Sequence, residues 1–97
     1  MVKKTSRRQA VDSVALFKLL ADRNRYSAIT LLSETRKGLL VGDIARSLGM
    51  GHSAMSHLLG LLHEHDIVSC KKEGRTVRYA ISGTPLARAL IRIIRAA

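Results

Sequence analysis

The sequence predicts one small, mainly α-helical domain that carries a single β-hairpin. Three observations predict it. Apolar residues recur at helical spacing in five stretches, whereas only two stretches, on either side of residue 74, are rich in strand-forming residues. A chain of 97 residues is long enough for one hydrophobic core. The hydrophobic content is 46% but only 3% of the residues are aromatic, and a core of Leu, Ile, Val and Ala suits packed helices better than a β-sandwich.

The first nine residues differ from the rest. They contain four cations, no acid and little apolar content, so we interpret 1–9 as a basic N-terminal arm and 10–97 as the folded domain. Two interpretations of the arm stay open and are compatible: a solvated terminus, or a segment that touches phosphates.

The first two predicted helices cover Ala10–Leu20 and Tyr26–Ser33. Between them lies a turn in which either Asp22 or Asn24 is placed to cap the second helix. After a polar turn at 34–38, the residues 39–41 are either a short strand or the apolar start of the next helix.

Two short helices joined by a tight turn are predicted between Val41 and Leu62. The first, 41–48, has apolar residues at i, i+3, i+4 and i+7, and Gly49 can adopt the positive φ that ends a helix. The second, 53–62, turns Met55, Leu58 and neighbouring leucines inward. Its other face is polar and small, as the major groove of DNA requires. The residues expected to contact DNA from this face are His52, Ser53, Ser56 and His57.

The two strand-like runs, 67–72 and 76–81, predict a hairpin with a cationic tip. A basic hairpin next to these two helices, a helix-turn-helix, is placed to contact the sugar-phosphate backbone of DNA. The alternative is that the tip is only a solvated turn. The hairpin residues expected on DNA are Lys71, Lys72, Arg75 and Arg78. Cys70 is expected to share an inner face with Val68 as a small packed residue, and an oxidation switch at this single cysteine is the less favoured alternative.

A last helix is predicted from Pro85, with Thr84 as its N-cap. Its wide apolar stripe either closes the monomer core or pairs, together with the first helix, against a second subunit across a two-fold axis. We favour the dimer. The expected interface residues are Val14, Phe17, Leu86, Leu90, Ile93 and Ile94.

Three stretches in register resemble the ArsR/SmtB family of bacterial winged-helix repressors. Residues 53–58 with Leu61 and Leu62 look like the family's recognition helix, residues 16–22 with Arg25 look like its first helix junction, and residues 73–79 look like its wing. The resemblance implies a dimeric winged helix-turn-helix (α-α-α-α-β-β-α) that binds an operator and is often released by a metal or another inducer.

This sequence departs from the metal-sensing members of that family. Leu40, Val41 and Gly42 stand where such members carry paired cysteines, and the last helix offers Arg and apolar residues where they carry Asp, His and Glu. His63 and His65 point about 200° apart on a regular helix and cannot chelate one ion. We therefore expect no metal site and no cofactor, and the inducer is left unknown.

The net charge of +10 and a pI near 10.9 make a polyanion the first partner to consider. We expect a sequence-specific transcriptional regulator, most simply a repressor, that binds double-stranded DNA as a homodimer. The alternatives are a low-specificity DNA-organising protein and a winged-helix module that binds another protein. An enzyme is not expected, because no Ser/His/Asp, Cys/His or paired-carboxylate arrangement can be proposed. No apolar run reaches membrane-spanning length and no signal-peptide pattern opens the chain, so we expect a cytoplasmic protein without a membrane partner.

Overall fold

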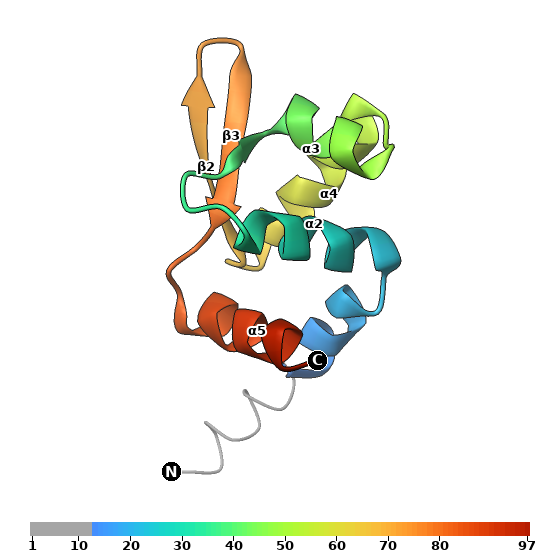
Figure 1. Ribbon diagram of the computed structural model, residues 1–97, viewed down its shortest axis with the longest axis vertical. Helices are drawn as coiled ribbons and strands as arrows, with labels where there is room; N and C mark the ends of the chain where they lie inside the picture. The colour runs from blue at the N-terminus through green and yellow to red at the C-terminus, as the bar shows by residue number, and fades with distance from the viewer. Residues whose placement is uncertain (1–12) are drawn as a thin grey trace.

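The computed structural model describes residues 13–97 (Figure 1). The basic arm predicted at 1–9 and the predicted helix start at Ala10 lie outside this range. The elements are a helical segment at 13–20, α2 (Arg23–Ser33), β1 (Leu39–Leu40), α3 (Val41–Leu48), α4 (His52–Glu64), β2 (Val68–Glu73), β3 (Thr76–Ile81) and α5 (Pro85–Ala96). The predicted order is confirmed, and of the two interpretations of residues 39–41 the short strand is the right one.

The junction before α2 explains why this helix starts earlier than predicted. The Asp22 carboxylate, rather than the Asn24 side chain, is the cap and accepts a hydrogen bond from the backbone N–H of Arg25 at 3.0 Å. The Arg25 guanidinium then donates back to the carbonyl oxygens of Leu19 at 2.9 Å and Lys18 at 3.3 Å. These bonds fasten the end of the 13–20 segment to α2.

The core gathers side chains from every helix and from the base of the hairpin. The largest fully buried side chains are Ile29, Leu32, Ile44, Met55, Leu59, Leu62, Ile67, Val68 and Leu90. α4 supplies three of these nine residues. Because its predicted apolar face is buried in the core, the opposite, polar face of α4 is turned to solvent.

The three strands form an antiparallel sheet in the order β1-β3-β2. β1 pairs only through Leu39 with Tyr79 and through Leu40 with Arg78, so the outer part of the hairpin is two-stranded. Just before β1, Gly38 adopts φ +81°, and an added Cβ would lie 2.2 Å from the carbonyl oxygen of Tyr79. Only glycine fits this turn.

The turn between α4 and β2 is tied to the start of α5. Asp66 adopts φ +60°, and its carbonyl oxygen accepts hydrogen bonds from the hydroxyls of Ser82 at 2.7 Å and Thr84 at 2.9 Å. Thr84 also accepts from the backbone N–H of Ala87 at 3.2 Å, and Pro85 opens the helix, as predicted.

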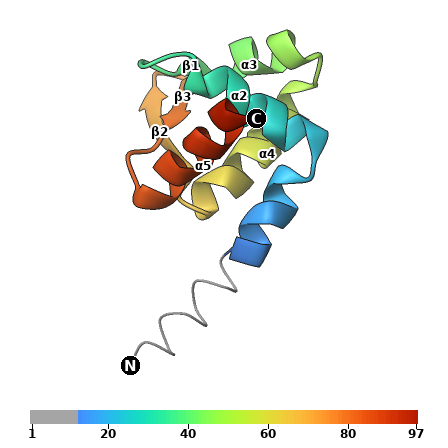
Figure 2. The same ribbon diagram turned by 60° about the horizontal axis from the view of Figure 1, so that its bottom comes forward.

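Figure 1 shows two ends. The hairpin and α3 lie at one end, and α5 with the 13–20 segment lies at the other. Figure 2 brings the second end forward and shows α5 in front of α2 and α4. Within residues 13–97, the helices are all too short or too polar to cross a membrane.

Candidate nucleic-acid interface

The turn between α3 and α4 is built as the sequence predicts. Gly49 adopts φ +65° and ends α3, while the backbone N–H of Met50 donates to the carbonyl oxygen of Ala45 at 2.9 Å. α4 starts three residues after Gly49, at His52. The two helices therefore form a helix-turn-helix with a three-residue turn.

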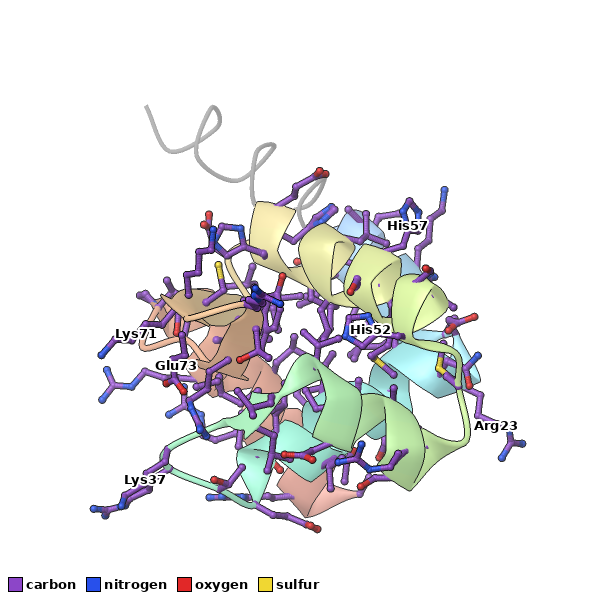
Figure 3. The ribbon with its side chains drawn as sticks, turned by 90° about the horizontal axis from the view of Figure 1, so that it is seen from above. Arg23, Lys37, His52, His57, Lys71 and Glu73 are labelled. Atoms are coloured by element: carbon purple, nitrogen blue, oxygen red, sulfur yellow. The ribbon has the colours of Figure 1, made fainter. Side chains whose placement is uncertain are left out.

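The two faces of α4 differ sharply. Its buried residues are Met55, Leu58, Leu59 and Leu62. On the other side His52, Ser53 and His57 are exposed and Ser56 is half-buried, so the four residues predicted to contact DNA from this helix share its solvent side. Figure 3 shows His52 on α4 near α3 and His57 directed away from the protein.

The middle of this outer face is hollow. A shallow groove is lined by Ser56, His57, Gly60, Leu61 and Glu64. Apart from the backbone of α4 itself, no atom of residues 13–97 lies within 4 Å of a Cβ built on Gly60, so this side of the helix is open here. The exposed carboxylate of Glu64 lies at the C-terminal end of the groove, where it would repel a phosphate.

The wing, β2 and β3 with the turn between them, carries three exposed cations. Lys71, Lys72 and Arg75 are exposed, and Gly74 adopts φ +62° at the tip. None of these three side chains forms an ion pair within the described residues. They are free to meet the phosphates of a duplex.

Arg78 differs from these three. Its Nε donates to Oε2 of Glu73 at 2.8 Å, and its Nη1 donates to the carbonyl oxygen of Gly38 at 3.2 Å. The hydrogen bond from Arg78 lowers the pKa of the Glu73 carboxyl, and the same bond raises the pKa of the guanidinium. Arg78 is thus held by two partners at the base of the wing, and its contact with DNA stays a prediction.

The prediction that Cys70 is a packed residue is wrong. Its side chain is exposed, because in β2 only Val68 is buried and the residues that follow it, including Cys70, lie on the open part of the wing. Cys70 lies opposite Tyr79 in the ladder, and burial, with a smaller contribution from Cys70, raises the pKa of the Tyr79 hydroxyl.

The histidines near the end of α4 do not converge. His63 is exposed, and Nδ1 of His65 lies 3.0 Å from the carbonyl oxygen of Leu61. Among residues 13–97 there is no group of three or more His, Cys, Asp or Glu side chains that could hold a metal ion.

The opposite end of the protein exposes apolar side chains. Val14 is 55% exposed, Phe17 59% and Ile93 46%. The other predicted interface residues lie deeper: Leu86 is half-buried, and Leu90 and Ile94 pack into the subunit's own core. One side of α5 therefore closes the subunit's own core, while Ile93 stays outside it, and the pairing of this helix with a second subunit stays a prediction.

Two features were missed by the sequence analysis. Glu73, which the hairpin pattern does not single out, is the partner of Arg78. Arg36 and Lys37 form a second exposed basic site in the loop before β1. In Figure 3 Lys37 and His57 lie at opposite edges of the protein, so this loop is separate from the outer face of α4.

Known proteins with similar sequences are transcriptional regulators, although no family model matches the chain. The arsenical resistance operon repressor of Escherichia coli (strain K12) is 36% identical over 69 residues, which are 71% of this chain and 58% of that protein. The SmtB homologue of Synechocystis, a transcriptional repressor, is 32% identical over 74 residues, which are 76% of this chain and 54% of that protein. The chain thus spans little more than half the length of these two relatives. The transcriptional activator HlyU of Vibrio cholerae is 29% identical over 87 residues, 90% of this chain and 78% of that protein.

Solved structures agree along most of the chain. Reduced HlyU from Vibrio cholerae superposes with a TM-score of 0.81 at 26% identity, over 96% of this chain and 95% of that one. The DNA-binding domain of Mb0332 from Mycobacterium bovis superposes with a TM-score of 0.76 at 26% identity, over 94% of this chain and 84% of that one. That domain is described as a homodimeric winged helix-turn-helix of a possible ArsR-family regulator.

Proposed function

Because the chain belongs to the ArsR/SmtB family of winged-helix transcriptional regulators, we propose that it binds an operator as a homodimer and represses transcription. One observation carries the proposal: the small, polar outer face of α4 accompanies a wing with three free cations, in a chain with a net charge of +10. Double-stranded DNA fits both features, because its major groove admits a helix and its phosphates attract the cations of the wing.

Each surface has its own role on the duplex. α4 enters the major groove, where Ser53, Ser56 and His57 contact phosphates and base edges and His52 lies at the start of the helix. The wing residues Lys71, Lys72 and Arg75 contact phosphates and add affinity without reading sequence. Contacts to about six phosphates per dimer correspond to a slope near −5 in a plot of log K against log salt concentration.

The dimer forms through the exposed apolar end. Phe17 and Ile93 are too exposed and too large to be explained by the subunit's own core. Paired across a two-fold axis with Val14, they place two α4 helices in successive major grooves about 34 to 36 Å apart. The operator is then an inverted repeat. The homodimeric Mb0332 domain supports this assembly.

The test is selection of bound duplexes from random DNA, followed by gel-shift titration. We expect an inverted repeat, and we expect His57→Ala to weaken binding to it by about tenfold to a hundredfold, the range of one base contact. His63→Ala is the matched control, because His63 is exposed on the same helix beyond the groove. Recovery of no common sequence, or equal effects of the two substitutions, would contradict sequence-specific recognition.

The sign of regulation needs its own readout. The relatives include named repressors and one named activator. A reporter gene placed behind the selected operator should fall in expression when the protein is present. A rise would make the protein an activator and leave the DNA-binding assignment intact.

A second candidate, a low-specificity DNA-organising protein, is favoured by the composition of the outer face of α4. This face contains no Arg, Asn or Gln, the residues that most often read bases. Competition between the selected repeat and bulk genomic DNA separates the two functions. A ratio of affinities below about 10³ favours the DNA-organising protein.

A further inference from the structure

Arg78 lies where the three-stranded sheet becomes two-stranded. Leu40 of β1 is opposite Arg78 in the ladder, and β1 pairs with no residue of β3 nearer the wing tip. Beyond this point β2 and β3 pair only with each other, and among the residues nearer the tip Val77 packs against the core. A two-stranded hairpin by itself is marginally stable, so the direction of the tip depends on what holds its base.

On one side, Arg78 is joined to the tip. Glu73 is opposite Thr76, and Arg78 is opposite Lys71, so Glu73 and Arg78 share one face of the hairpin and their ion pair at 2.8 Å crosses it diagonally. Both side chains are only about one-third exposed, at 33% for Arg78 and 38% for Glu73. The bond connects Arg78, the β3 residue nearest the tip that still pairs with β1, to Glu73 at the end of β2.

On the other side, Arg78 is joined to a fixed point of the fold. Gly38 is buried, and its backbone N–H donates to the Thr35 hydroxyl at 3.2 Å. Its backbone also packs against Tyr79 and Ala80 so closely that no side chain fits. The carbonyl oxygen that accepts from Arg78 therefore cannot move without displacing β3.

We propose that Arg78 is a positioning residue: together with Glu73 and Gly38 it forms a wing brace that fixes the direction of the hairpin tip. The inference rests on the proposed function, because the tip must be aimed for Lys71, Lys72 and Arg75 to reach phosphates while α4 occupies the groove. The planar fork of the guanidinium is what allows one side chain to bond both partners. Lysine keeps the charge but has a single ammonium group on a flexible stem.

The experiment compares three variants with the unmodified protein by salt titration of binding to one fixed duplex, from about 50 to 200 mM salt. Arg78→Lys and Arg78→Gln should each weaken binding by about tenfold, the effect of losing one charged hydrogen bond. Their salt slopes should match that of the unmodified protein. Lys71→Gln, the control that removes a free cation, should reduce the slope by about 1.8 per dimer. Unchanged binding of Arg78→Lys, with a reduced slope for Arg78→Gln, would make Arg78 a phosphate contact and overturn the proposal.

Amide hydrogen exchange of the free protein provides a readout that does not involve DNA. Arg78→Lys and Glu73→Gln should accelerate exchange in residues 70–77 by about tenfold, whereas Lys72→Gln, on the other face of the hairpin, should not. If the unmodified protein binds no duplex, the proposed function fails, and this exchange experiment still decides whether the brace exists. Equal exchange in all four proteins would overturn it.

Discussion

The two ends of the molecule differ in the kind of surface that they leave uncovered. At one end α4 and the wing expose small polar side chains and the cations Lys71, Lys72 and Arg75. At the other end the 13–20 segment and α5 expose Phe17 and Ile93. Charge attracts a polyanion over a long range but is screened by salt, whereas apolar area associates only on contact and is nearly insensitive to salt.

We propose that the first end binds DNA and that the second end binds a second subunit. A duplex and a second copy of the chain are both needed for a two-fold complex, because each subunit alone presents only one α4. Binding of the second half-site is then intramolecular and strengthens the complex without new contacts. The predictions below test this division of roles, from the largest expected effect to the smallest.

Phe17→Asp is expected to have the largest effect. A carboxylate in an apolar interface remains unpaired and desolvated, so the dimer should dissociate and operator affinity should fall by about a hundredfold or more. Sedimentation equilibrium measures the first effect and gel-shift titration the second. Tyr26→Asp is the matched control, since Tyr26 is 38% exposed on α2. A Phe17→Asp protein that stays dimeric would place the interface elsewhere.

Removing two cations from the wing should affect DNA binding and leave the dimer intact. Lys71→Gln combined with Arg75→Gln deletes four phosphate contacts per dimer, so the salt slope should fall by about 3.6. Arg36→Gln combined with Lys37→Gln removes the same charge from the loop before β1 and should leave the slope unchanged. If the two double variants behave alike, the duplex responds only to net charge, and the wing has no special role.

Local patterns were sufficient to predict much of this fold. Three features depend only on neighbours within four residues: the bounds of α3, the inward residues of α4 and the Thr84-Pro85 start of α5. Helical spacing and capping chemistry therefore predict them. The polar face of α4 follows directly from its buried face. The family resemblance added the winged-helix topology, which spacing alone could not supply.

The features that the sequence left open or did not reveal depend on distant residues. β1 has only two residues, and it is a strand because of Tyr79 and Arg78, about 40 positions later. The Glu73–Arg78 pair depends on the register of the two hairpin strands. Periodicity alone likewise does not show that the Cys70 side chain is exposed. The apolar stripe of the last helix also does not show which of its residues are buried in the subunit's own core, as Leu90 is.

Gly60→Ala tests how closely the outer face of α4 approaches its partner. The position is helical and open, so alanine should stabilise the protein by about 1 kcal/mol and raise the thermal midpoint by about 4 to 8 °C. If a duplex lies against the groove at Gly60, the added methyl group should weaken operator binding at the same time. A gain in stability with unchanged binding would show that only the first turns of α4 reach the DNA.

Glu73 at the wing end should show the smallest effect, a pH dependence of stability. Its pKa is lowered in the folded protein by the hydrogen bond from Arg78, so the pair contributes stability above the ordinary pKa of a glutamate and loses it as the pH falls through the lowered value. Glu73→Gln should therefore lower the thermal midpoint slightly at neutral pH, and the difference should vanish in acid, where both proteins carry an uncharged side chain. The pair is solvent-exposed and so should also weaken with salt. A difference in thermal midpoint that persists in acid would mean that the shape of the Glu73 side chain, rather than its charge, supports the wing.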